Sequence, residues 1–272
     1  MNPVTAGRSF FTHNAAELAK QVGAGHIRAV ARVISLLENR DPAGTAVLTQ
    51  LAPSPNRAFV IGVTGYPGTG KSALIDQLII AYRRLGQKVG VLAVDISSPV
   101  TGGAVLGDRI RMQRHADDPQ VYIRSMATRG HQGGLAEATG QASRVLDAAG
   151  YGVILIETVG VGQNELEVMH AVHTVVAVVA PGLGDDVQAM KAGLLEIADI
   201  VVVNKGDREG ADAALRDLRE WCKTVIRTVA VTGDGIAELI AVIAEHERWR
   251  DLDSPELHKR RGLFINRGSS AG

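Results

Sequence analysis

The sequence predicts an α/β fold in which a doubly wound, mostly parallel sheet carries helices on both faces. Short apolar runs alternate with helical patterns over residues 56–246, and most of these runs are continuously apolar, as in parallel sheets buried on both faces. The octapeptide GYPGTGKS at residues 65–72 follows one apolar run and precedes a helical pattern, which is the context of a P-loop. We therefore expect a P-loop NTPase fold with its ligand at the carboxyl ends of the strands.

The individual elements follow from these patterns. The strand before the octapeptide is predicted at residues 58–64 and the helix after it at residues 73–80. Further strands are expected at residues 89–95, 121–125, 152–158, 174–181, 199–204 and 225–231, and further helices at 135–149, 187–197, 211–224 and 235–246.

The chain before residue 56 is predicted to be helical. Helical periodicity covers residues 14–39, and the turn signal at Asp41 and Pro42 ends it before a short helix to about residue 51. We expect an N-terminal helical extension over residues 1–55, the P-loop domain over residues 56–246, and a short C-terminal tail over residues 247–272.

Composition argues against several classes of function. The 29 basic residues balance the 29 acidic residues, and aromatic residues make up 4% of the chain, so neither charge nor stacking favours nucleic acid or a membrane surface. We find no signal peptide and no membrane-spanning stretch. The single cysteine, Cys222, excludes internal disulfides and fits a reducing compartment. We expect a cytoplasmic protein, or one processed into an organelle matrix.

The octapeptide is expected to hold a nucleoside triphosphate. Its glycines allow a tight turn that points N–H groups at phosphate, and the following helix N-terminus adds partial positive charge. Lys71 is expected to reach the β- and γ-phosphates, and Ser72 to offer its hydroxyl to Mg²⁺. The residues predicted to contact the phosphates are Gly65, Pro67, Gly68, Thr69, Gly70, Lys71, Ser72 and Ala73.

Residues 204–207, NKGD, indicate which base is bound. The ionised carboxylate of Asp207 only accepts hydrogen bonds, so it matches the N1–H and 2-amino donors of guanine and repels the N1 acceptor of adenine. The methylenes of Lys205 can cover the base, and Asn204 can tie loops together. We therefore expect GTP and GDP rather than adenine nucleotides.

Two acidic residues at strand ends are candidates for a magnesium site. Asp95 and Glu157 each end a predicted strand, and Mg²⁺ prefers hard oxygen ligands. After Glu157, the N–H of Gly160 could reach the γ-phosphate and Gln163 could orient water. Helix capping or a surface position is the alternative for either carboxylate. By themselves, Asp108 and Arg111 fit a solvated helix face equally well.

Four segments together are more specific than a general GTPase pattern. They are residues 94–99 (VDISSP), 101–112 (TGGAVLGDRIRM), 124–134 (RSMATRGHQGG) and 156–163 (IETVGVGQ). They closely resemble the MeaB/ArgK group of methylmalonyl-CoA mutase-associated GTPases, which includes the human methylmalonic aciduria type A protein. The resemblance covers about residues 29–247.

The resemblance implies a GTP hydrolase that acts as a chaperone. Such a protein gates delivery of adenosylcobalamin to a B12-dependent acyl-CoA mutase and protects that enzyme. It also implies that the magnesium and switch acids are Asp95, Asp108 and Glu157, that the switch arginine is Arg111, and that residues 181–191 form a switch loop that communicates with the mutase. The combined catalytic set is Lys71, Asp108, Arg111, Glu157 and Gln163, and the combined metal set is Ser72, Asp95, Asp108 and Glu157.

The sequence departs from the family pattern at a few positions. The family usually has proline at Ile96, threonine at Ala73 and alanine at Gly206. Its fifth guanine element, typically Ser-Ala, reads Val229-Ala230 here, where a backbone N–H can still contact the base carbonyl. Family members also continue into a helical dimerisation arm, whereas few residues follow His246, which counts against a homodimer formed by that route.

Two other functions stay open at this point. One is a small-molecule kinase of the amino-acid transport type, although no dedicated lid insertion is visible. The other is a nickel-insertion GTPase, although no histidine-rich stretch or Cys–His ligand set accompanies the nucleotide motifs. The mutase could act on methylmalonyl-, isobutyryl-, hydroxyisobutyryl- or ethylmalonyl-CoA.

Overall fold

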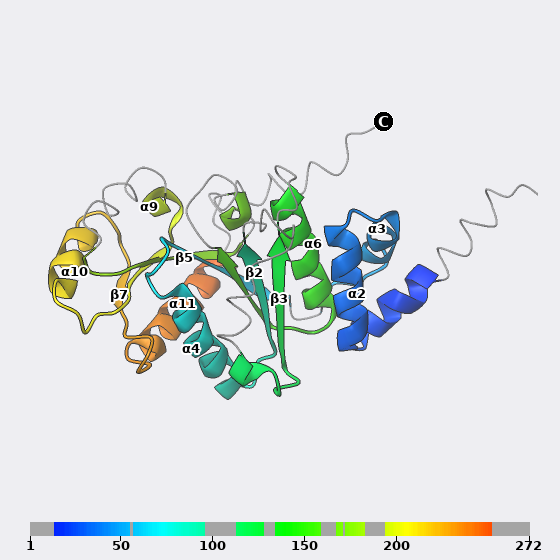
Figure 1. Cartoon of the computed structure of the whole chain (residues 1–272), viewed down its shortest axis with the longest axis horizontal. Helices are drawn as coiled ribbons and strands as arrows, with labels where there is room; N and C mark the ends of the chain where they lie inside the picture. Colours follow the sequence, from blue (N-terminus) through cyan, green and yellow to red (C-terminus); the bar gives the residue numbers. More distant parts are fainter. Residues whose placement is uncertain are drawn as a thin grey trace, which may run out of the picture.

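The computed structural model describes residues 14–54, 57–95, 113–127, 134–158, 167–170, 172–182 and 194–251. Its centre is a seven-stranded sheet with the order β3-β2-β4-β1-β5-β6-β7, and every neighbouring pair is parallel (Figure 1). The predicted doubly wound α/β fold is confirmed. The strands are β1 (Phe59–Thr64), β2 (Val89–Asp95), β3 (Val121–Ala127), β4 (Val153–Thr158), β5 (Thr174–Val179), β6 (Ile200–Val203) and β7 (Val225–Arg227).

Helices cover both faces of the sheet (Figure 1). Alternate residues of each strand point to opposite faces, and the hydrophobic clusters follow this alternation. Ile61 and Val63 of β1 pack with α4 (Lys71–Arg84) and α11 (Ile236–Asp251), whereas Val60 lies in the cluster that contains α6 (Gly134–Ala148). On that second face, α10 (Ala211–Arg219) packs against the β5–β7 end of the sheet. The described residues also include the short helix α9 (Leu194–Ile197) and the 3-10 helix η1 (Gln113–His115).

The N-terminal extension packs on the outside of α6. It consists of a helix over residues 14–23, α2 (Ile27–Glu38) and α3 (Pro42–Leu48), which share one hydrophobic cluster with α6. The periodicity over residues 14–39 predicted continuous helix, but the helix breaks at Gly25, whose φ of 77° is left-handed. The predicted break at Asp41 is confirmed, since its side chain accepts a hydrogen bond from the Ala43 N–H and caps α3.

Several element ends differ from the predicted ones. Strands expected to reach residues 181 and 231 end at Val179 and Arg227, because the chain there turns into loops at the carboxyl edge of the sheet. The helix expected at 211–224 ends at Arg219, and the one expected at 235–246 continues to Asp251. Most of the helix expected at 187–197 lies outside the described residues. Within the described part, none of the helices has the length and apolar character needed to cross a membrane.

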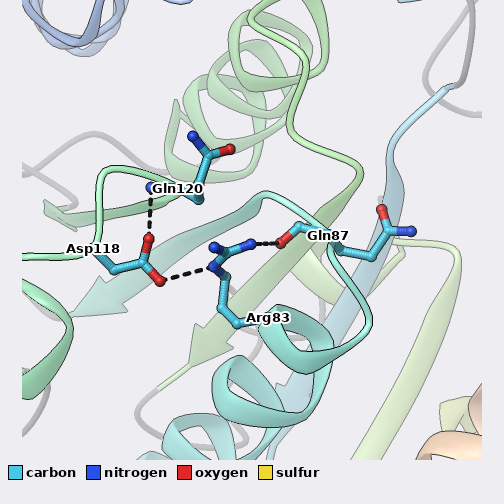
Figure 2. A network of polar contacts seen from close by, with 4 residues as sticks. All are labelled: Arg83, Gln87, Asp118 and Gln120. Carbon is cyan, nitrogen blue, oxygen red and sulfur yellow. Dashed lines mark hydrogen bonds and ion pairs between the residues drawn. The ribbon is translucent and has the colours of Figure 1, made fainter.

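An ion pair between Arg83 and Asp118 connects the end of α4 to the chain before β3 (Figure 2). Nε of Arg83 donates to Asp118 at 2.8 Å, and its NH1 group donates to the Gln87 carbonyl oxygen at 2.7 Å. The other Asp118 carboxylate oxygen accepts the Gln120 N–H at 2.8 Å. The hydrogen bond from Arg83 is the largest cause of a lowered pKa at Asp118, with the Gln120 N–H adding to it and partial burial opposing it.

Replacing Arg83 with methionine is expected to lower the free energy of unfolding by up to about 1 kcal/mol at pH 7, since the paired side chains are 23% and 32% exposed. A carboxylate with a lowered folded pKa stabilises the fold above its unfolded value of 3.8, and this contribution is lost as the pH falls through the folded pKa. Urea unfolding should therefore separate wild type and variant at neutral pH and bring them together in acid. The exposed neighbour Arg84, changed to methionine, is the matched control.

Candidate nucleotide site

The candidate site lies at the carboxyl edge of the sheet, where the chain leaves β1 for the P-loop. Because the strands are parallel, the ends of β1, β2, β4 and β6 meet at this edge. At two positions of the loop, neighbouring atoms lie so close to the backbone that only glycine fits. A Cβ on Gly65, at φ 142°, would lie 2.2 Å from the Val178 carbonyl oxygen, and one on Gly70, at φ 94°, would lie 2.3 Å from Nδ2 of Asn204.

The helix that follows the loop, α4, begins without a side-chain cap, so the backbone N–H groups of its first turn can bind an anion. The N-cap of α4 is Gly70 in the left-handed conformation, and no side chain caps the helix. The N–H groups of the first turn and the helix dipole therefore face the position where phosphate is expected. Nζ of the buried Lys71 donates to the carbonyl oxygens of Gly65 at 2.8 Å and Tyr66 at 3.0 Å, so the loop wraps around its ammonium group.

Asn204 joins three loops of the site. Its Nδ2 donates to the Thr69 carbonyl oxygen of the P-loop at 2.9 Å. Its Oδ1 accepts from the Thr228 hydroxyl at 3.1 Å and from the Ala230 N–H at 3.0 Å. The side chain is almost fully buried, so these bonds are shielded from water. The predicted role of Asn204 in tying loops together is confirmed.

The two residues predicted to recognise the base lie beside this junction. Nζ of Lys205 donates to the Gly68 carbonyl oxygen at 2.5 Å, so its side chain spans from the loop after β6 to the P-loop. Asp207 is exposed, and in the part of the chain that the structure describes no hydrogen bond or ion pair occupies its carboxylate. The phosphate loop and the candidate base site are therefore contiguous.

The fifth guanine element is already engaged with the protein. The Val229 N–H donates to the Asp234 carbonyl oxygen, and the Ala230 N–H donates to Asn204. A base carbonyl placed here would compete with Asn204 for the Ala230 donor. Thr228 was not among the predicted site residues, although its position directly before Val229 is a signal that could have identified it.

A hydroxyl and a carboxylate meet beside the phosphate loop. The Ser72 hydroxyl donates to Oε1 of Glu157 at 2.8 Å, and both side chains are buried. The strand pleat explains the contact, because Glu157 has the same orientation as Val153 and Leu155, which pack in the cluster that contains α4. Asp95 ends β2, which pairs with β4. A hydroxyl and two carboxylates are hard oxygen donors, so the chemistry of these residues fits Mg²⁺.

Some predicted site residues cannot be placed. Asp108, Arg111, Gly160 and Gln163 lie outside the described residues, as do residues 183–191 of the predicted switch loop. For Asp95 the backbone position is described and the side chain is not. The other predicted site residues all lie in the described part of the chain: Gly65, Pro67, Gly68, Thr69, Gly70, Lys71, Ser72, Ala73, Glu157, Asn204, Lys205, Asp207, Val229 and Ala230. Hydrogen bonds join Lys71 to Gly65, Ser72 to Glu157, Asn204 to Thr69 and Ala230, and Lys205 to Gly68.

Comparison with known proteins decides the family. The family model described as methylmalonyl-CoA mutase-associated GTPase MeaB matches residues 30–263, which include every described residue of the candidate site. The chain belongs to the MeaB family of GTPases.

Individual MeaB relatives agree with this assignment. GTPase ArgK of Escherichia coli is 38% identical over 82% of this chain and 73% of its own length. The mitochondrial methylmalonic aciduria type A homologue of Caenorhabditis elegans is 32% identical over 91% of this chain and 69% of its own length. A protein of Pyrococcus horikoshii reaches 50% identity over 90% of this chain and 81% of its length.

Comparison with solved structures shows that the similarity includes the fold. A LAO/AO transport system kinase superposes with a TM-score of 0.70 at 27% identity, covering 97% of this chain and 81% of the other. The hydrogenase maturation factor HypB of Archaeoglobus fulgidus has a TM-score of 0.51 at 19% identity, covering 88% and 98% of the two chains, and this match speaks for the fold alone.

Proposed function

We propose that this MeaB-family GTPase uses Mg²⁺-dependent GTP hydrolysis to control cofactor loading and protection of an adenosylcobalamin-dependent acyl-CoA mutase. The nucleotide part rests on the hydrogen bonds of Asn204, which join the P-loop to the candidate guanine loop, residues 204–207, and to the loop after β7. The family's association with methylmalonyl-CoA mutase supports the partner.

In the proposed reaction, water attacks the γ-phosphorus of GTP and the bond to the β,γ-bridging oxygen breaks, leaving its electron pair on GDP. Lys71 offsets charge on the β- and γ-phosphates, and the N–H groups of the α4 N-terminus bind phosphate oxygens. Among the described residues, Ser72, Glu157 and Asp95 would hold Mg²⁺, which when bound would supply positive charge to offset the charge that develops on the phosphates. Asp108, Arg111, Gly160 and Gln163 stay as proposals for the switch and water-positioning roles.

The partner half of the proposal is tested by measuring GTP hydrolysis with and without acyl-CoA mutases from the same genome. One mutase is expected to change the rate several-fold, and its capture on the immobilised GTPase should differ between GDP and a non-hydrolysable GTP analogue. If no acyl-CoA mutase alters hydrolysis or binds in either nucleotide state, the partner is wrong. Transfer of labelled γ-phosphate to an amino acid would instead support a kinase.

A further inference from the structure

Arg227, at the end of β7, donates hydrogen bonds to the backbone of the candidate guanine loop. Its Nε and NH2 groups donate to the Gly206 carbonyl oxygen at 2.9 and 2.5 Å, and its NH1 group lies 3.0 Å from Oδ1 of Asp212. Gly206 lies between Lys205 and Asp207, and its carbonyl belongs to the peptide group that leads into Asp207. None of the predicted base-recognition roles uses this arginine.

The loop at this point holds a strained residue. Lys205 has φ 56°, a left-handed conformation that is unfavourable for an L-residue with a side chain. Such a conformation persists only when neighbouring contacts hold it. Both polar backbone groups of Gly206 supply these contacts: its N–H donates to the Thr228 carbonyl oxygen at 2.9 Å, and its carbonyl accepts from Arg227. The N–H and the carbonyl of Gly206 therefore both connect the loop to the end of β7, at Arg227 and at the next residue, Thr228.

The absence of a side chain at position 206 makes room for this arginine. A Cβ on Gly206 would lie 2.6 Å from Cγ and 2.8 Å from Nε of Arg227. These atoms belong to the inner part of the side chain, so a methyl group could be accommodated only if Arg227 moved away from the Gly206 carbonyl. The backbone of Gly206 itself is not among the left-handed glycines, so alanine would fit it otherwise.

The ion pair with Asp212 is the weaker of the two contacts. The Arg227 and Asp212 side chains are 45% and 71% exposed, and pairs this exposed contribute little to stability. The carbonyl of the buried Gly206 receives two donors from one planar guanidinium. Hydrogen bonds from charged donors are worth more than neutral ones, and the planar fork of arginine fixes direction as well as distance.

We propose that Arg227 is a positioning residue for guanine specificity. It holds the peptide group between Gly206 and Asp207, and thereby sets where the Asp207 carboxylate meets the N1–H and 2-amino donors of guanine. The lack of a side chain at Gly206 leaves room for the Arg227 side chain. This inference rests on the proposed binding of guanine by Asp207, and the two can fail separately.

The test compares binding of GDP with binding of inosine diphosphate, whose base lacks the 2-amino group. Wild type is expected to bind GDP more tightly, and the ratio of the two dissociation constants reports the contact of the 2-amino group, the one donor of the proposed Asp207 pair that inosine diphosphate lacks. Arg227→Met, which keeps the side-chain stem, is expected to reduce this ratio by about fivefold or more, since a charged donor pair to the loop is lost. Arg227→Lys should restore part of it through a single donor.

Asp212→Asn is the matched control, because it weakens only the exposed ion pair of Arg227. Its ratio should stay within about twofold of wild type. An unchanged ratio in Arg227→Met would overturn the inference, as would an equal reduction in Asp212→Asn, which would assign the effect to the ion pair.

A second test of the inference uses other variants, so it remains informative even if Arg227→Met does not fold stably. Gly206→Ala is expected to lower the ratio in the wild-type background, where the new Cβ displaces Arg227. In an Arg227→Ala background, where no Cγ is present, the same change should add little. Additive effects would contradict the proposal.

Asp207→Ala separates this inference from the guanine site itself. If it abolishes the preference for GDP and Arg227→Met leaves the preference intact, only the role of Arg227 is wrong. If Asp207→Ala keeps the full preference, guanine is recognised elsewhere and both proposals fall.

Discussion

Replacing Lys71 with alanine is expected to lower the rate of GTP hydrolysis at saturating GTP by roughly two to three orders of magnitude, as when one preorganised charge-stabilising donor is removed from an active site. The structure supplies the reason: the ammonium group is buried within the P-loop and held by the carbonyl oxygens of Gly65 and Tyr66. Single-turnover hydrolysis of labelled GTP measures this loss without interference from product release.

Lys88→Met is the control for removing a lysine. Lys88 lies just before β2, at the opposite edge of the sheet, with Nζ 4.8 Å from the centre of the Tyr151 ring. The Lys88→Met protein should hydrolyse GTP at the wild-type rate. A Lys71→Ala protein that hydrolyses GTP at the wild-type rate would show that the P-loop is not the catalytic phosphate site.

Replacing Asp207 with asparagine is expected to change the preferred base. The asparagine amide can donate to the 2-carbonyl of xanthine, whereas it faces guanine donors with a donor of its own. GDP affinity should fall by roughly 100-fold or more, and xanthosine diphosphate should become the better ligand, because mismatched polar groups are rejected strongly. Titration calorimetry with both nucleotides measures the exchange.

Asp217→Asn on α10 removes the same charge from an exposed position and should leave both affinities unchanged. Equal loss of GDP and xanthosine diphosphate binding in Asp207→Asn would indicate damage to the loop rather than a change in recognition.

The fold was predictable because its signals are local. The buried strand before GYPGTGKS, the helix after it and the apolar run before Asn204 each appear within a few residues of sequence. The strand order was not predictable, since it depends on which strands pair across long separations. Gly25 ended a helix that periodicity alone would continue, because its left-handed φ is a property of the packed chain.

The candidate site also has some residues whose roles could be predicted from the sequence and some contacts that could not. Lys71, Asn204 and Asp207 belong to motifs, so their roles could be proposed from residue type and spacing. The contact between Ser72 and Glu157 joins residues 85 positions apart, and only the strand pleat brings them together. Gly206 stands where the family resemblance leads one to expect alanine, and nothing in the sequence explains the difference. The structure gives one, in the guanidinium of Arg227.

Recognition of guanine at this site is tested by the affinity of the protein for GDP and for ADP, measured in the presence of Mg²⁺. We expect GDP to bind at least roughly a thousandfold more tightly, because the proposed contact of the Asp207 carboxylate uses both guanine donors and adenine offers neither. Comparable affinities for the two nucleotides would contradict it.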